Sequence, residues 1–171
     1  MPMNAMTIPT HTTASTYEHV QRGWLIPLCL YGTAVFAALS LNTARKDEDL
    51  PWVIWGLPVL LLVLGHYFSA LRVRVDAGEV RVAWSWDWPA VRHALDSIEG
   101  AEACKHGWWY GYGLRWTSRG WLWNAQGAAA VRLRLRGGKC FHIGTDDQAG
   151  LLAAVNAALA ARGAGAAPLK L

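Results

Sequence analysis

Two long stretches of the chain carry no charged side chain, and they run from Gly23 to Leu41 and from Leu50 to Leu71. Each is about 20 residues long, roughly the length that a helix needs to cross the hydrocarbon core of a bilayer. Helices buried in soluble proteins seldom stay apolar on every side over such a length. The pattern predicts a two-helix transmembrane hairpin over residues 22–71, with helices at about 23–41 and 50–71. The Thr-rich residues 1–21 show no periodicity and are predicted to be a disordered tail.

Basic residues suggest how the hairpin is oriented. The loop between the two stretches carries Arg45 and Lys46, next to three acidic residues. The other side of the predicted membrane carries more basic residues, which favours cytoplasmic termini. Cys29 lies within the first stretch, and the three cysteines do not suggest a disulfide framework, which fits a reducing compartment. The basic residues on the side of the termini are Arg22, Arg72, Arg74 and Arg81.

Beyond residue 71 the hydrophobic period changes from that of a helix to that of a strand. Apolar and polar residues alternate over 71–76 and again over 80–88, with a turn at Ala77-Gly78. The second alternation sets Val80, Val82 and three tryptophans on one face, so these tryptophans are predicted to lie in a core. They are Trp84, Trp86 and Trp88.

An aromatic cluster, GWWYGYGLRWTSRGWLWN, occupies residues 107–124. Most of its large side chains share one parity in two predicted strands, and we expect them inside a sheet. Trp109 has the opposite parity, beside Gly111 and Gly113, and is expected to point outward as a partner-binding surface. The side chains expected inside are those of Trp108, Tyr110, Tyr112, Leu114, Trp116, Trp121 and Trp123.

Two further strands and a helix complete the pattern. Val131, Leu133 and Leu135 are expected to face inward, and three arginines outward; in the next strand Phe141 and Ile143 should face inward. A helix follows, with a capping box at Thr145–Gln148 and an apolar face, and residues 163–171 are expected to be a flexible tail. The arginines are Arg132, Arg134 and Arg136; the helix face comprises Leu151, Leu152, Val155, Ala158 and Leu159.

The segment from Gly111 to Val155 resembles the core of small bacterial membrane proteins in which a pleckstrin-homology-like (PH-like) domain follows a transmembrane hairpin. Its Gly-Tyr-Gly-Leu-Arg and Ile-Gly-Thr-Asp motifs carry the resemblance, with Tyr112 where Trp is expected and Cys140 as a second departure. The fold class expected is an α+β membrane protein whose residues 72–162 form an antiparallel β-sandwich or barrel of roughly six or seven strands, capped by a C-terminal helix. The resemblance implies a bacterial inner membrane location and supplies no reaction.

Two Cys-x-His pairs are the strongest candidates for chemistry, since positions two apart in a strand share a face and four such ligands suit tetrahedral zinc. They are Cys104-Lys-His106 and Cys140-Phe-His142. In a PH-like arrangement, however, the two strands belong to different sheets and their outward faces diverge. We therefore predict neither a metal site nor a cofactor. His66 is open to two interpretations, a functional group or a residue that reaches the membrane interface.

The sequence contains no hydrolase or nucleotide-binding motif, so we expect a non-enzymatic protein. The leading interpretation is an accessory, assembly or scaffolding factor for another membrane protein, held at the bilayer because strand residues follow the second helix at once. One alternative is binding of anionic lipid headgroups by Arg132, Arg134 and Arg136. An enzyme that uses Cys140 or His142 is a further alternative. Nucleic acid is not an expected partner, because no recognised binding module is present.

Overall fold

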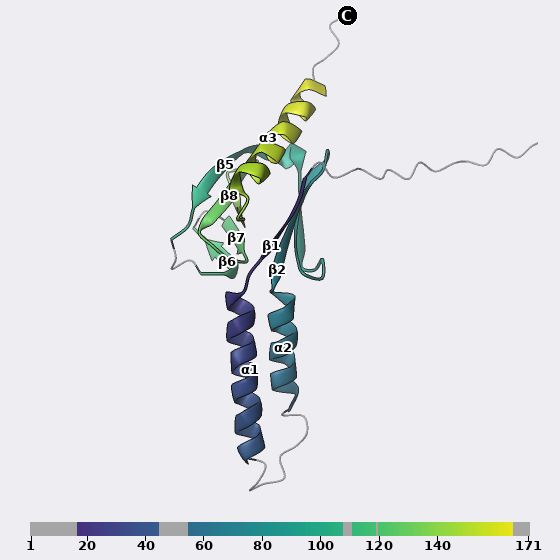
Figure 1. Cartoon of the computed structure of the whole chain (residues 1–171). Coiled ribbons are helices and arrows are strands. Elements are labelled where there is room, and N and C mark those ends of the chain that lie inside the picture. The colour runs from purple at the N-terminus through teal and green to yellow at the C-terminus, as the bar shows by residue number, and fades with distance from the viewer. Residues whose placement is uncertain (1–16, 45–54, 108–110, 119, 166–171) are drawn as a thin grey trace, which may run out of the picture.

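The computed structural model describes residues 17–44, 55–107, 111–118 and 120–165. These residues form an α+β fold with two β-sheets and a C-terminal helix, while helices α1 and α2 lie side by side beyond the sheets (Figure 1). The helices are α1 (Leu25–Ala44), α2 (Gly56–Tyr67) and α3 (Gln148–Gly165), with a short 3-10 turn at Leu95–Ser97. The strands are β1 (Tyr17–Arg22), β2 (Ala70–Val75), β3 (Glu79–Trp84), β4 (Ala90–Ala94), β5 (Ile98–Lys105), β6 (Gly113–Thr117), β7 (Gly120–Asn124), β8 (Ala129–Leu135) and β9 (Cys140–Gly144).

The two sheets differ in the number and direction of their strands. The first has the order β1-β2-β3-β4 and is antiparallel; the second has the order β5-β8-β9-β7-β6. In the second sheet the β8–β9 hairpin lies between β5 and β7, so β9 runs parallel to β7. The prediction of a purely antiparallel arrangement is therefore wrong at this one pairing. The described residues also contain more strands than predicted, because β1, β4 and β5 lack a clear apolar alternation.

Strand β1 corrects the predicted N-terminal tail, since residues 17–21 are part of an ordered strand. It pairs antiparallel with β2, from Tyr17 opposite Val75 to Arg22 opposite Ala70. Every second side chain of β1 points toward other parts of the fold, and these side chains carry polar groups. The sequence therefore shows no apolar alternation from which the strand could be predicted. These side chains are held by hydrogen bonds instead: Tyr17 to Asp147, His19 to Asp146, and Gln21 to the carbonyl oxygen of Gln126.

The hydrophobic core lies between the sheets and is covered at one end by α3. The predicted helix face is confirmed, with Leu151, Val155 and Ala158 buried. The helix starts where predicted but is capped differently: the Asp147 carboxylate accepts the Gly150 backbone N–H at 2.9 Å. Asp147 is thus the N-cap in place of Thr145. The predicted flexible tail is wrong for residues 163–165, which remain helical. The other buried core residues include Leu71, Val73, Val75, Val80, Val82, Trp84, Trp123, Val131, Leu133, Phe141 and Ile143.

Of the three tryptophans assigned to the core from 84–88, only Trp84 is buried, and Trp86 and Trp88 are exposed. Strand β3 ends at Trp84, and the backbone turns there with Asp87 at φ 63° and its N–H donated to the Trp84 carbonyl oxygen. Alternation in the sequence continues past the point where the strand stops. The parity argument therefore fails for the last two tryptophans.

The two apolar helices differ in length in the described part of the chain. The segment Leu25–Thr43 has the length and composition of a membrane span, whereas α2 is apolar but shorter. The second helix was predicted over residues 50–71, and residue 50 lies outside the described residues. In the structure α2 ends at Tyr67, before the predicted end, because β2 begins at Ala70. Figure 1 shows both helices extending from the same side of the sheets.

Gly120 is expected to be essential for the parallel pairing of β7 with β9. Its φ is 135°, and a Cβ placed there would overlap the carbonyl oxygen of Cys140. Gly120→Ala should therefore lower the free energy of unfolding by roughly 2–6 kcal/mol, from backbone strain and overpacking together. Gly127→Ala is the matched control, because Gly127 has φ 88° but open space around it. It should cost only about 1–2 kcal/mol. Equal losses in chemical denaturation of the two full-length variants would contradict this account.

Candidate functional site

The predicted partner-binding surface is only partly described. Trp109 lies outside the described residues, so its outward orientation stays a prediction. Gly113 is buried, and a Cβ added to it would lie 3.8 Å from Ile26 Cδ1, near the start of α1. Gly111 lies against the guanidinium group of Arg115. Gly113 therefore packs beside the helical segment, and the expectation that it offers a flat outer surface is wrong.

A different part of the aromatic cluster is exposed. Trp116 and Trp121 face each other across β6 and β7, with ring centroids 5.0 Å apart and planes at 88°. They are 69% and 46% exposed, although the parity of the strands places them on the same sheet face as the buried Trp123. The prediction that they lie inside is correct for the face and wrong for the burial. Leu114, on the same face, is also exposed.

The two tryptophans are exposed because the sandwich is open at this edge. They border a cleft of about 630 Å³ that is also lined by His93 of β4 and by Cys140 and Phe141 of β9. Helix α3 packs against β5, β8, β1 and β2, away from this edge. Burial lowers the pKa of His93, whose ring lies 4.6 Å from that of Phe141, so the imidazole is neutral at pH 7. The cleft is therefore mainly apolar and aromatic, with Lys139 as a charged residue in its lining.

A second cavity, of about 910 Å³, lies where the helices meet the first sheet. Its lining combines basic and aromatic side chains, among them Arg22, Trp24, Arg72 and Trp86. His66 also lines it, with its ring 5.8 Å from that of Trp86. This placement does not decide between the two interpretations of His66, but it gives the residue an aromatic neighbour at the boundary of the two parts.

Of the three arginines predicted to form one strand face, Arg132 and Arg134 lie on that face of β8, alternating with buried Val131 and Leu133. Arg132 forms an ion pair with Glu102, with Nε and Oε1 3.2 Å apart. Arg134 is exposed on β8, but Arg136 follows the end of the strand. The Arg136 N–H donates to the carbonyl oxygen of Ser97, in the 3-10 turn whose Leu95 N–H donates to Gly78. Gly78 lies between β2 and β3, at the end of β2 opposite α2, so Arg136 is remote from α1 and α2.

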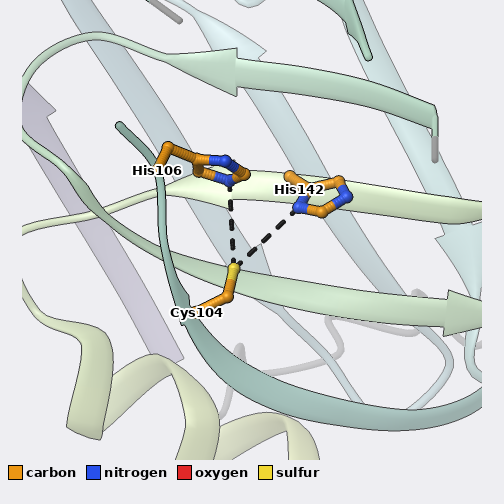
Figure 2. Close-up of side chains that lie close together, drawn as sticks. All are labelled: Cys104, His106 and His142. Atoms are coloured by element: carbon orange, nitrogen blue, oxygen red, sulfur yellow. Dashed lines mark hydrogen bonds between the residues drawn. The ribbon is translucent and has the colours of Figure 1, made fainter. Parts of the chain in front are cut away.

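The Cys-x-His pairs produce the clearest cluster of chemical groups. Cys104 at the end of β5, His106 just beyond it, and His142 of β9 place their ligand atoms within 4.8 Å of one another. Figure 2 shows both imidazoles directed toward the sulfur, with Cys104 Sγ 3.9 Å from His106 Nε2 and 3.9 Å from His142 Nδ1. The prediction that the strands belong to different sheets is wrong, since β5 and β9 flank β8 in one sheet. Cys140 does not join the group.

No protein-family model matches the chain, and no curated protein sequence matches it significantly.

Burial keeps the Cys104 thiol and the His106 imidazole neutral at pH 7. Burial raises the pKa of the Cys104 thiol, against an opposing effect of Arg132, and Glu102 raises it further. Burial also lowers the pKa of His106, and Arg132 lowers it again. The thiol and the two imidazoles share a cavity of about 310 Å³ with Thr117, Ser118 and Arg132. Neutral imidazole is the form of histidine that binds metal ions.

Proposed function

We propose that the chain is a non-enzymatic inner-membrane protein of a bacterium, in which a two-helix hairpin carries a PH-like β-sandwich on the cytoplasmic face. It acts as an accessory, assembly or scaffolding factor by binding a segment of another membrane protein. The observation that carries the proposal is the uncovered pair of Trp116 and Trp121 beside the open edge of the sandwich.

The outward surface of the helices supports membrane anchoring. Val35, Phe36 and Leu39 of α1 are more than half exposed, with Phe36 at 73%, and α2 exposes Leu57 and Val59 in the same way. Contiguous apolar surface of this extent is unfavourable in water, at about 25 cal/mol per Å². A bilayer removes that cost. Trp24 directly precedes α1, and tryptophan is enriched at the interfacial ends of membrane-spanning helices.

The junction between helices and strands supports a fixed position of the β-sandwich. The Gly23 N–H donates to the Ser69 carbonyl oxygen at 2.8 Å. A residue between β1 and α1 is thus bonded to the residue before β2. The Phe68 ring packs edge-on against Trp84, with centroids 5.0 Å apart. Such a connection holds the sandwich close to the bilayer, where membrane-embedded partners are present at high effective concentration.

The open edge has the chemistry of a docking site for an apolar segment. Exposed tryptophan is enriched among residues that dominate binding energy, and here two are placed edge to face at the border of a cleft. Among the described residues, β6 is also the edge strand of its sheet, a position that suits pairing with an extended segment. We therefore assign the cleft to an extended, apolar segment of a membrane-protein partner.

A second candidate function, binding of an anionic lipid headgroup, is favoured by the cavity at the junction. Arg22 and Arg72 line it together with Trp24 and Ser85, at the level where lipid phosphates lie if α1 spans the bilayer. Arg72 is 3.7 Å from Glu18, a long and exposed ion pair that leaves it available to a phosphate. These residues suit the role better than Arg134 and Arg136.

Membrane anchoring predicts opposite labelling of two native cysteines by an impermeant maleimide. In a variant that retains Cys29 alone, labelling of intact membranes should occur only after detergent is added, because α1 is surrounded by lipid. In a variant that retains Cys140 alone, inverted vesicles should be labelled and intact spheroplasts should not. Labelling of Cys29 without detergent, or of Cys140 from outside the cell, would overturn the proposed topology.

Docking at the open edge predicts that Trp116→Ala and Trp121→Ala each weaken partner binding by about 2 kcal/mol, roughly thirtyfold. Their large exposure means that thermal unfolding should change little. The measurement is quantitative recovery of membrane proteins with the full chain from mild detergent. Trp88→Ala is the matched control, since Trp88 is 73% exposed but does not line the cleft. Equal recovery with all three variants would exclude this site.

Headgroup binding predicts that the double variant Arg22→Gln/Arg72→Gln retains less anionic phospholipid after purification. At about 1 kcal/mol for each basic residue, the loss is roughly thirtyfold in affinity. Lipid extraction and mass spectrometry of the detergent-solubilised chain give the measurement, and Arg134→Gln/Arg136→Gln is the control. If the control loses as much lipid, the junction cavity is not the site.

A further inference from the structure

We propose that Cys104, His106 and His142 form a binding site for one zinc-type divalent ion, a role that is independent of the docking function above. Figure 2 shows the three side chains converging from β5, from the residue just beyond it and from β9. One thiolate and two imidazoles are ligands that zinc prefers, and three protein ligands with an open fourth position are a known arrangement.

The distances between the ligand atoms are close to those of a tetrahedral site. With Zn–S near 2.3 Å and Zn–N near 2.0–2.1 Å, a tetrahedral ion separates sulfur and nitrogen by about 3.6 Å. Both S···N separations here are 3.9 Å. Closing the sulfur–nitrogen difference requires side-chain shifts of a few tenths of an ångström. The two imidazole nitrogens, which lie within 4.8 Å of each other, must approach to about 3.3 Å.

The backbone around the cluster is fixed by contacts that do not involve the ligand atoms. Gln148, the first residue of α3, donates its side-chain amide to the carbonyl oxygens of Cys104 and Ala130, at 2.8 and 2.7 Å. These two bonds join β5 and β8 at the level of the cysteine. His142 is only 4% exposed and lies on the central strand β9. A site held on strands in this way keeps its ligand geometry.

Binding of the ion releases one proton, that of the Cys104 thiol. The ion forms a bond to Cys104 Sγ, the S–H bond breaks, and the proton leaves to solvent, while both imidazoles bind as neutral ligands. The thiolate and the divalent ion leave one net positive charge. Arg132 lines the same cavity but is paired with Glu102, which offsets its repulsion of the ion.

The fourth coordination position faces the cavity of about 310 Å³, where Thr117 and Ser118 supply hydroxyl groups. Water or a small anion suits this position, given the net positive charge of the centre. Cys140 is excluded as the fourth ligand, since it lines the cleft of Trp116 and Trp121 instead.

The test uses the full-length chain in mild detergent under reducing conditions. After equilibration with zinc and desalting, we expect about one zinc per chain by plasma mass spectrometry, and close to none in Cys104→Ser and His142→Asn. The Cys140→Ser variant should keep its zinc. Titration of the zinc-free chain with Co²⁺ should give a thiolate-to-cobalt charge-transfer band that is lost in Cys104→Ser.

The double variant Cys29→Ser/Cys140→Ser keeps the test decisive if Cys104→Ser fails to fold, because Cys104 is then the only thiol in the chain. Survival of the cobalt band in this variant supports the site. A folded wild-type chain that shows neither bound zinc nor the band would overturn the proposal. Zinc retained in full by a folded Cys104→Ser variant would also overturn it, as adventitious binding.

Discussion

The structure depends on one constraint: α1 begins just after β1 and α2 ends just before β2, and these two strands are hydrogen-bonded to each other. The Gly23–Ser69 hydrogen bond and the pairing of β1 with β2 make the helix pair and the first sheet continuous. No glycine- or serine-rich linker separates them, so the position of the sheet follows from the direction of the helices. Every surface of the second sheet acquires a fixed orientation relative to α1 through this junction. The hydrogen bond from the Trp24 N–H to the side-chain oxygen of Gln126 reinforces it.

Much of the fold follows from hydrophobic period alone. Burial on one side of an element forces a regular spacing of apolar residues, and this spacing can be found in the sequence. It predicts the strands over 71–75 and 129–135 and the buried face of α3, and the two apolar stretches are found by their lack of charge. Strand β1 cannot be predicted from hydrophobic period, since its inward side chains form hydrogen bonds to Asp146 and Asp147. The failure at Trp86 has a different origin. A turn ended the strand while the alternation continued in the sequence.

The candidate sites were harder to predict, because they depend on which strands become neighbours. Cys104 and His142 are far apart in the chain, and only the insertion of the β8–β9 hairpin beside β5 brings their side chains together. Parity correctly predicted the face on which Trp116 and Trp121 lie. Their exposure follows from the extent of the opposite sheet, which no local pattern encodes. The feature of the sequence that indicates this site is the pair Trp116 and Trp121, which face each other across a tight hairpin.

The order of elements has a consequence for biosynthesis. Strand β1 leaves the ribosome before α1, yet its partner β2 follows α2. Its side chains also bond to Gln126 and to Asp146 and Asp147, which lie just before α3. The first sheet is therefore completed only after both helices have been made, because β1 cannot pair with β2 until α1 and α2 have been synthesised. Formation of this sheet thus requires α1 and α2 to have come together side by side.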